Sequence, residues 1–388
     1  MTLASTPEMI VAQRVFDGTQ WLTDVAVRLD AGKIASVAPA DRAIAAANAV
    51  VLPHGTILAP GLVDLQVNGG GGVLLNDAPS AATVQTMLRA HRTFGTTGFL
   101  PTLISSDFAT LAALAAAAPA IAAIPGVLGL HLEGPFLNPA RRGVHDAAVL
   151  RSPDARDLAA IEAIARVTRV LVTLAPECVP PGVIRRLVAI GVVVAIGHSD
   201  ATAAEVDAAV GEGATGVTHL FNAMRQIGPR EPGVVGAALD DARLISGLIC
   251  DGIHVAPANV RLAFKTLGRD RLALVSDAMP SVGAADPAFT WGGRRISLAD
   301  GRLTTADGTL AGAHLGMIEA VRNVAALDGI PLEDALVMAS RTPARLLGLD
   351  RSHGRIAPGF AADLVAFSPE FNVTATWIGG QRAADAGV

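Results

Sequence analysis

The sequence predicts a (β/α)8 TIM barrel joined to a small β-sandwich domain that the N- and C-terminal segments build together. Three observations predict this α/β fold. Apolar β-like runs alternate with Ala- and Leu-rich helical segments through the middle of the chain, as in a parallel sheet with helical crossovers. Eight such runs over about 300 residues favour a closed barrel over an open sheet. Both ends of the chain carry short β-like runs separated by turns.

The small domain begins with residues 1–57, where turns at Asp17-Gly18 and at residues 30–32 separate the β-like runs. These strands are too few to close a core, so we expect similar runs after residue 353 to complete the domain. The predicted boundaries are therefore 1–57 and 354–388 for the small domain and 58–353 for the barrel. The predicted strands are Ile10–Ala12, Val25–Leu29, Lys33–Val37, Ala49–Leu52, Ala362–Phe367 and Thr374–Ile378.

The barrel strands are short apolar runs, and the helices between them follow from periodicity. Leu158, Ile161 and Ala165 share one helical face. A second face is shared by Met317, Val321, Val324 and Ala325. The predicted strands are Leu62–Asn68, Gly98–Leu103, Val127–Glu133, Val170–Leu174, Val192–His198, Gly216–Leu220, Ile245–Cys250 and Leu272–Asp277.

Two glycine-containing segments lie beside these strands. Gly69–Gly72 lacks the Lys-Ser/Thr pair of a phosphate-binding P-loop, so we expect a flexible loop at the barrel mouth. Residues 281–309 form an apparent insertion after the last strand, which we interpret as a β-hairpin or lid. Within it, Arg294 and Arg295 are expected to be solvated.

The composition indicates a well-buried globular protein. Hydrophobic residues make up 51% of the 388 residues, charged residues 17%, and glycine occurs 40 times. A net charge of −5 without a basic cluster argues against a nucleic-acid partner. Cys178 and Cys250 belong to no paired motif, and the N-terminus shows no signal-peptide pattern. We therefore expect a cytoplasmic protein with reduced thiols.

One uncharged segment, Ala109 to Leu130, is long enough to span a bilayer. Pro119, Pro125 and Gly126 interrupt it, and most of its residues are alanine. We therefore expect a surface helix, a turn and a strand, and no membrane partner.

Polar and acid/base side chains follow six of the predicted barrel strands. The active site of a barrel lies at the C-terminal ends of its strands, so these side chains should gather there. Taken singly, each histidine could be a buried core residue and Asp277 a helix cap. Taken together they favour a site, because buried parallel strands normally stay apolar to the end. The residues are Gln66, Asn68, Glu133, His198, His219, His254 and Asp277.

Two histidines and one glutamate with an open fourth position are typical of catalytic zinc. Glu133, His198 and His219 could hold such an ion. The bound ion would lower the pKa of a coordinated water to roughly 7. Asp277 could then accept a proton from that water and return it to a leaving group.

These residues lie in motifs that resemble those of the N-acetylglucosamine-6-phosphate deacetylases of the amidohydrolase superfamily. The match runs in order along nearly the whole chain. The ending, Gly354-Arg355-Ile356 to Val365, is similar to the superfamily's return to its small β-domain. The motifs are Ala59-Pro60-Gly61-Leu62-Val63-Asp64, His131-Leu132-Glu133-Gly134-Pro135, Gly197-His198-Ser199, Thr218-His219-Leu220-Phe221-Asn222-Ala223-Met224, Asp251-Gly252-Ile253-His254, Ser276-Asp277-Ala278 and Leu310-Ala311-Gly312.

The resemblance implies hydrolysis of an acetamide to glucosamine 6-phosphate and acetate. It implies that Asp277 moves the proton and that His145 polarises the acetamide carbonyl. It also implies a homodimer in which Arg230 reaches the partner's active site. The substrate contacts that it assigns are Gln66, Asn68, Asn222, Ala223, Arg230, His254 and Leu310.

One departure from the wider superfamily bears on the metal. Most of its members carry His-x-His after the first strand, whereas this chain has Gln66-Val67-Asn68, whose amides are poor zinc ligands. The chain therefore resembles the single-metal branch of the deacetylases. We expect one divalent ion per subunit, Zn²⁺ first, with Fe²⁺, Co²⁺ or Mn²⁺ as alternatives.

Two alternatives stay open at this point. One is an amidohydrolase that deacetylates another N-acetylated sugar phosphate, such as the galacto epimer, or an N-acyl amino acid. The other is a non-catalytic scaffold with the same fold. The second is disfavoured because Glu133, His198, His219 and Asp277 are all present.

Overall fold

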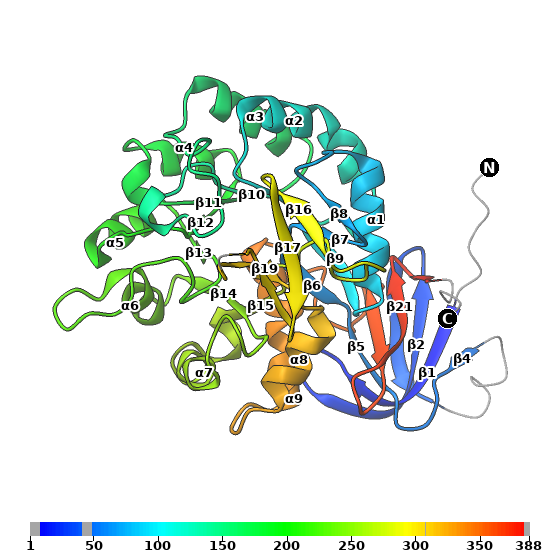
Figure 1. The fold of residues 1–388 in the computed structure, drawn as a ribbon. Coiled ribbons are helices and arrows are strands. Elements are labelled where there is room, and N and C mark those ends of the chain that lie inside the picture. Colours follow the sequence, from blue (N-terminus) through cyan, green and yellow to red (C-terminus); the bar gives the residue numbers. More distant parts are fainter. Residues whose placement is uncertain (1–7, 41–48, 307, 384–388) are drawn as a thin grey trace.

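The structure is a computed structural model that describes residues 8–40, 49–306 and 308–383. Eight parallel strands form its central sheet, in the order β15-β14-β13-β12-β11-β10-β9-β6. Val67, at the end of the first strand, forms a parallel bridge with Ala278 beyond the last, so the sheet closes into the predicted barrel (Figure 1). The strands are β6 (Leu62–Val67), β9 (Thr96–Ile104), β10 (Leu130–Glu133), β11 (Val170–Leu174), β12 (Val193–Ile196), β13 (Gly216–Val217), β14 (Ile245–Ile249) and β15 (Leu272–Val275).

Helices surround the barrel, and polar caps fix where several of them begin. Asp154 starts α3 through a capping box with Asp157, and Thr202 starts α5 in the same way with Glu205. The helices are α1 (Ala81–Arg92), α2 (Phe108–Ala122), α3 (Ala155–Ala165), α4 (Val183–Ala189), α5 (Ala203–Gly211), α6 (Gly233–Asp240), α7 (Pro257–Arg271), α8 (Met317–Ala325), α9 (Leu332–Met338) and α10 (Arg341–Leu346), with 3-10 turns at Pro139–Arg141 and Pro176–Cys178.

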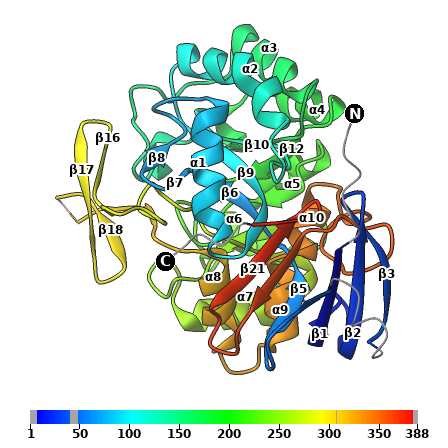
Figure 2. The same cartoon turned by 90° about the vertical axis from the view of Figure 1, so that its right-hand side faces the viewer.

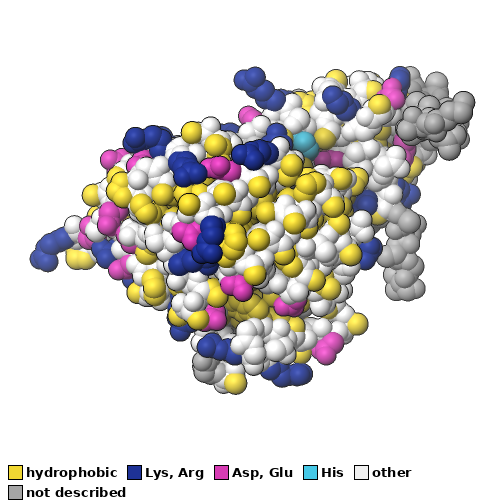
Figure 3. All heavy atoms as spheres, turned by 90° about the horizontal axis from the view of Figure 1, so that it is seen from above, with side chains coloured by type: hydrophobic (Ala, Val, Ile, Leu, Met, Phe, Trp, Pro, Cys, Tyr) yellow, Lys and Arg dark blue, Asp and Glu magenta, His cyan; other side chains and the backbone are white. Residues whose placement is uncertain are grey.

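The predicted helical faces are confirmed. Leu158 and Ile161 of α3 are buried, as are Met317, Val321 and Val324 of α8. The uncharged segment after residue 108 forms α2, a turn and β10, and none of the described helices is long and apolar enough to cross a bilayer. Apolar side chains cover much of the face that carries α2 and α3, with charges of both signs between them (Figure 3).

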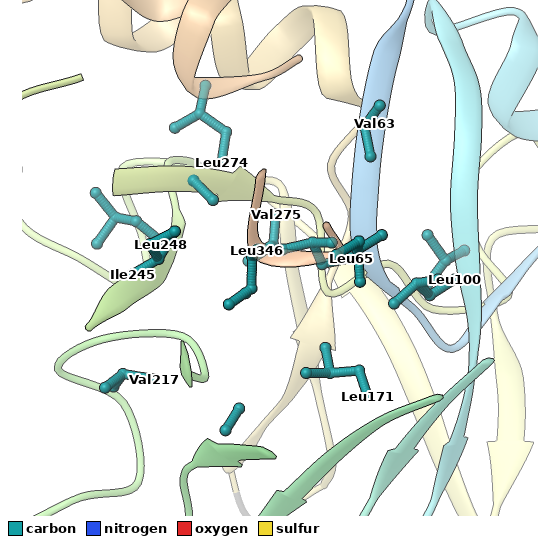
Figure 4. Packing of buried hydrophobic residues seen from close by; sticks show 14 of the residues in the cluster. Val63, Leu65, Leu100, Leu171, Val217, Ile245, Leu248, Leu274, Val275 and Leu346 are labelled. Carbon is teal, nitrogen blue, oxygen red and sulfur yellow. The ribbon is translucent and has the colours of Figure 1, made fainter. Parts of the chain in front are cut away.

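The barrel interior is a packed apolar core. Leu65 of β6, Leu171 of β11 and Val275 of β15 point toward one another, and Leu346 of α10 reaches in among them (Figure 4). All of them belong to the larger cluster of buried side chains. Apolar side chains thus fill this part of the barrel, and the candidate site residues lie at or beyond the ends of the strands.

A second, mixed sheet of eight strands joins the two ends of the chain, as predicted. β5, which the sequence analysis missed, pairs in parallel with β1 and antiparallel with β20, and so links the two segments. A separate core around Ile10, Leu58 and Trp377 lies on this sheet. Residues 1–7, 41–48 and 384–388 of the predicted domain lie outside the described residues, and the boundaries at 57 and 353 stay a prediction. The strands are β1 (Glu8–Phe16), β2 (Trp21–Asp30), β3 (Lys33–Pro39), β4 (Ala49–Val51), β5 (Ile57–Pro60), β20 (Leu364–Phe367), β21 (Val373–Ile378) and β22 (Gln381–Arg382).

Several predicted strands are too long. β12, β13 and β15 end two to three residues before the predicted ends, β14 ends one residue early, and β10 starts at Leu130 rather than Val127. The cause at the three site residues is backbone conformation. His198, His219 and Asp277 have φ of 49°, 31° and 50°, which is the left-handed region and cannot continue a ladder.

The glycine run is not the flexible loop that we expected. Gly69 and Gly70 are buried in β7 (Gly69–Gly70), which pairs with β8 (Val73–Leu74) in a two-stranded hairpin. The insertion contains the predicted hairpin, extended to a four-stranded antiparallel sheet. In Figure 2 it projects from the barrel on the side opposite β1, β2 and β3. Its strands are β16 (Phe289–Trp291), β17 (Arg294–Ala299), β18 (Arg302–Thr304) and β19 (Leu310–Ala313).

Candidate metal centre and active site

Three buried side chains converge beyond the barrel strands. Oε1 of Glu133, the last residue of β10, lies 3.2 Å from His198 Nε2 and 3.0 Å from His219 Nε2. The two Nε2 atoms are 3.0 Å apart. Among the described residues, these three form the one group of acidic, histidine or cysteine side chains with the convergence that a metal ion needs.

The donor atoms fit a divalent cation. Nδ1 of His198 lies 2.9 Å from the carbonyl oxygen of Arg141. A carbonyl only accepts hydrogen bonds, so this contact places the proton of a neutral His198 on Nδ1 and leaves a lone pair on Nε2. That lone pair faces a carboxylate oxygen of a buried side chain, an arrangement that a cation between them stabilises.

The electrostatics of the cluster favour a negative Glu133. Burial by itself raises the pKa of the Glu133 carboxyl, but the close contacts of its Oε1 with the His198 and His219 imidazoles outweigh burial and hold that pKa well below its usual value. For the imidazole of His219, burial has the opposite effect and lowers the pKa. The hydrogen bond from His219 to Glu133 more than offsets burial, so the pKa of His219 is raised overall. The carboxylate is therefore ionised and ready to bind a cation.

Asp277 lies beside this cluster, held by two side-chain amides. Its Oδ1 accepts from Gln66 Nε2 at 3.0 Å and from Asn68 Nδ2 at 2.7 Å. The same Gln66 amide donates to Glu133 Oε1 at 2.8 Å, so it bridges the two carboxylates. Burial, followed by the nearby charge of Glu133, raises the pKa of Asp277 to about 6. A carboxyl with that pKa exchanges a proton readily near neutral pH.

His145 approaches the cluster from another side. Its ring centroid is 4.4 Å from that of His198, and its Nε2 is 3.8 Å from Glu133 Oε2. Burial, followed by an unfavourable electrostatic interaction with His198, lowers the pKa of His145 to about 3, so the His145 imidazole is neutral. Its Nδ1 lies 2.7 Å from Ser105 Oγ. Ser105, which the sequence analysis missed, therefore fixes the orientation of the ring.

A cavity of about 170 Å³ opens onto these groups. Gln66 and Arg230 are not among its lining residues. Gln66 is buried between the carboxylates, and Arg230 is exposed on the loop before α6. The structure brings together in the lining the other ten predicted site residues, Asn68, Glu133, His145, His198, His219, Asn222, Ala223, His254, Asp277 and Leu310.

The sequence analysis missed residues that orient or enclose the site. Asp251 accepts from the His254 ring at 2.6 Å and lies in the same motif, so its spacing was a usable signal. Ile104, Met279 and Trp291 line the cavity as apolar residues, for which no sequence signal distinguishes a site from a core. His131, between Leu130 and Leu132, bonds through both ring nitrogens to Thr102 and Thr173 and lies away from the cavity lining.

The amidohydrolase family matches residues 57–383, which span the barrel and the last strands of the second sheet. The chain belongs to the amidohydrolase family. Amidohydrolases are metal-dependent, in keeping with the Glu133, His198 and His219 group of this member.

Characterised relatives of this amidohydrolase include deacetylases of two amino-sugar phosphates. It is 41% identical to an N-acetylgalactosamine-6-phosphate deacetylase of Shewanella sp. over 85% of this chain and 84% of that protein. It is 39% identical to the human N-acetylglucosamine-6-phosphate deacetylase over 84% of this chain and 83% of that protein. It is 35% identical to the Vibrio furnissii N-acetylglucosamine-6-phosphate deacetylase over 97% of this chain and 94% of that protein.

Solved structures agree over the whole length. An N-acetylglucosamine-6-phosphate deacetylase from Pasteurella multocida superposes with a TM-score of 0.93 at 34% identity, covering 98% of this amidohydrolase and 100% of that chain. A variant of the Mycobacterium smegmatis deacetylase in complex with N-acetyl-D-glucosamine 6-phosphate superposes with a TM-score of 0.89 at 32% identity. The match covers 97% of this chain and 99% of that chain.

Proposed function

We propose that this protein hydrolyses the acetamide of N-acetyl-D-glucosamine 6-phosphate to D-glucosamine 6-phosphate and acetate, a step of amino-sugar metabolism. The observation that carries the proposal is the convergence of Glu133, His198 and His219 beside a carboxyl with a raised pKa, Asp277, in one cavity. Relatives at 35% and 39% identity are named as deacetylases of this substrate. A water molecule is consumed, the amide C–N bond breaks, and a C–O bond forms on the acetyl carbon.

The ligands of the ion would be Glu133, His198 and His219. A set of two nitrogens and one oxygen suits Zn²⁺, and Fe²⁺, Co²⁺ or Mn²⁺ also bind such sites. When bound, a divalent ion polarises a carbonyl and lowers the pKa of a coordinated water. The Arg141 carbonyl, bonded to His198 Nδ1, would hold that imidazole in the ligating tautomer.

One ion per subunit follows from the amides of Gln66 and Asn68. Both point N–H donors at Asp277 Oδ1, and Gln66 points another at Glu133. A second cation between the two carboxylates would need ligand atoms with lone pairs. The amides present N–H hydrogens there instead. Metal analysis of the purified protein that found two tightly held ions per chain would contradict this.

Asp277 would move the proton. As a carboxylate it accepts a proton from the attacking water, and as an acid it gives that proton to the departing nitrogen, because an amide anion is too poor a leaving group. Neutral His145 would stabilise the negative charge that develops on the acetamide oxygen. The 2.7 Å contact between Ser105 Oγ and His145 Nδ1 would hold the ring with its Nε2 toward the cluster.

The phosphorylated end of the substrate would lie toward Asn222, Ala223 and His254. All three line the cavity, and Asp251 holds the His254 ring. Leu310, the first residue of β19, also lines the cavity. It would contact the sugar together with Asn68. Gln66 would act on the substrate only through the two carboxylates that it bridges.

A homodimer would complete the phosphate site. Arg230 is exposed and lies outside the cavity of its own chain, on the loop between β13 and α6. Ile227 on the same loop is 55% exposed, which is unusual for a large apolar side chain and fits burial by a second copy. Arg230 would thus reach the active site of the partner.

A second candidate substrate is N-acetyl-D-galactosamine 6-phosphate. Relatives from Shewanella sp. and Escherichia coli O157:H7, at 41% and 36% identity, are named as deacetylases of that epimer. The two substrates differ only in the direction of one hydroxyl group, and the acetamide and the phosphate are the same.

Acetate release from three compounds tests the proposal. With one defined metal ion, we expect N-acetylglucosamine 6-phosphate to be hydrolysed with the highest kcat/KM, its galacto epimer less well, and unphosphorylated N-acetylglucosamine at least tenfold less. Equal turnover of the unphosphorylated sugar would contradict the phosphate assignment. A higher kcat/KM for the galacto epimer would favour the second candidate.

A further inference from the structure

Two side chains separate the active-site cavity from a second cavity at the barrel mouth. The second cavity has a volume of about 260 Å³. Val144 and Trp291 line both cavities. The second cavity is otherwise bounded by Ser105, Arg142, Asp146, Arg294, Ile296 and Thr305.

The sequence places Trp291 at this boundary through a tight hairpin. Gly292 and Gly293 have φ of 56° and 73°, so both central turn residues are left-handed, as a two-residue hairpin of this type requires. Trp291 and Arg294 face each other across the turn in the register of β16 and β17. The hairpin therefore fixes the position of the indole relative to the strands.

The hairpin is tied to the active site by apolar packing. Trp291 packs against a cluster that contains Ile296 and Leu303 of the insertion, together with Ile104 and Met279 from the barrel. Ile104 ends β9, and Met279 follows Asp277 by two residues. The indole is thus held against residues that also line the active-site cavity.

His145 lies between Trp291 and the candidate metal ligand His198. The ring centroid of Trp291 is 6.5 Å from that of His145, with the rings at 85°, and His145 in turn is 4.4 Å from His198. An acyl carbonyl between His145 and the cluster would direct its alkyl group toward the apolar side chains Ile104, Met279 and Trp291. Such a surface suits a methyl group, which has no hydrogen bond to satisfy.

We propose that Trp291 sets the length of the acyl group that the enzyme accepts, and that the second cavity admits longer acyl chains once the indole is removed. The inference rests on the proposed amide hydrolysis and adds the acyl specificity of that same site. With a longer chain the reaction is unchanged in its bonds: water adds to the acyl carbon, the C–N bond breaks, and a longer carboxylate leaves with the amine.

The test compares kcat/KM for N-acetyl- and N-butyrylglucosamine 6-phosphate. Trp291→Ala should raise the butyryl-to-acetyl ratio at least tenfold over the wild type, because a pocket discriminates a single methylene by about 10- to 200-fold and butyryl has two more than acetyl. Trp291→Phe, which keeps an aromatic ring in the hairpin, should raise it by a smaller factor. The matched control is Arg295→Ala, an exposed neighbour in β17 that lines neither cavity and should leave the ratio unchanged. An unchanged ratio in both Trp291 variants would overturn the proposal.

A binding measurement supplies a readout that does not need turnover. The chain has three tryptophans, and the other two, Trp21 and Trp377, lie in the second sheet. In an Asp277→Asn background, N-acetylglucosamine 6-phosphate should change the indole fluorescence, and the change should disappear when Trp291 is also replaced by Phe. The same fluorescence change with and without Trp291→Phe in the Asp277→Asn protein would contradict the placement of Trp291 against the substrate.

The two proposals fail in different ways. If the wild type releases acetate from neither N-acetylhexosamine phosphate, the proposed function fails. If the wild type is active and both Trp291 variants keep its acyl preference, only the role of Trp291 fails.

Discussion

Asp277 is oriented by neutral amides and lies beside a charged carboxylate. Two amide donors, from Gln66 and Asn68, hold one of its oxygens, while burial and the charge of Glu133 raise its pKa to about 6. The amides orient the carboxylate without adding a positive charge. A carboxyl with this pKa suits the proposed role of Asp277, which is to accept a proton and return it in the same turnover.

Replacing Asp277 by Asn tests that role. The variant keeps the size of the side chain but cannot carry the proton, so kcat should fall by about 10²- to 10⁴-fold. The fold and the bound metal should remain, because Asp277 is not among the converging ligand atoms. Circular dichroism, metal content and acetate release measure the three properties, and near-normal turnover would refute the role.

Asp64 gives a prediction about stability and pH. It is fully buried in β6, where its Oδ1 accepts from the backbone N–H groups of Gln66 and Ser276, and burial raises its pKa from 3.8 to about 7. The folded state thus binds this proton more tightly than the unfolded state, so the contribution to stability is full below pH 4 and is lost as the pH rises through 7.

Asp64→Asn should remove this pH dependence. Relative to the wild type, its free energy of unfolding should improve between pH 5 and pH 8, by at most about 3 kcal/mol. Urea unfolding at the two pH values measures the change, with the exposed Asp328→Asn as a control. A difference between variant and wild type that does not move with pH would show that Asp64 does not titrate in this range.

Sequence patterns predicted the candidate site residues that carry charge or ligand atoms, and they did not point to the residues that contact these. Glu133, His198 and His219 follow apolar runs, and that placement brings them together once the barrel closes. Ser105 and Trp291 carry no such pattern. Both lie beside His145 only because the fold brings them there, and that is a long-range property of the structure.

At the scale of single elements, the strand ends are where sequence and structure differ most. His198, His219 and Asp277 extend apolar runs in sequence but leave the strands with left-handed backbones. Such conformations cost about 1–3 kcal/mol each and persist only where the surroundings impose them. A periodicity argument contains no information about them, so the predicted strands were too long.

Gly312 in β19 ties the insertion to Asp277. Its φ is 69°, and a Cβ there would lie 2.5 Å from Met279 Cγ and 3.2 Å from the carbonyl oxygen of Asp277. Gly312→Ala should therefore destabilise the fold by roughly 2–4 kcal/mol, from left-handed strain and overpacking together. It should also lower kcat by displacing the segment around Asp277.

Gly301→Ala is the matched control for this variant. Gly301 belongs to the same insertion and has φ of 75°, but a Cβ there would meet only Ile253 Cδ1, at 3.6 Å. It should lose about 1–2 kcal/mol of stability and keep its turnover. Urea unfolding and acetate release compare the two, and equal turnover in both variants would contradict the link from β19 to Asp277.

At the scale of the whole molecule, alternation of apolar runs and helices was enough to predict the barrel, and short β-like runs at both ends predicted their shared sheet. The prediction missed β5, although this strand joins the two segments. Its sequence, Ile57-Leu58-Ala59-Pro60, is buried throughout and runs almost directly into β6. No turn of several residues separates β5 from β6, so the sequence analysis assigned a strand only to the second of them.

The proposed dimer predicts complementation between inactive variants. An Arg230→Ala chain would damage the active site of its partner, to which Arg230 is proposed to contribute. An Asp277→Asn chain would damage its own active site, because it lacks the group proposed to carry the proton. Mixing the two after dissociation should restore about one quarter of wild-type activity, because half of the random dimers are mixed and each has one intact site. Activity no higher than the mean of the two separate variants would place Arg230 outside the partner's site.

The most direct test of the account is a titration of metal-free protein with Zn²⁺, followed by acetate release from N-acetylglucosamine 6-phosphate. Activity should rise linearly to one equivalent per chain and then stay constant, and Glu133→Ala should neither retain the ion nor recover activity. Full turnover by the stripped protein, or a rise that continues to two equivalents, would contradict a single catalytic ion held by Glu133, His198 and His219.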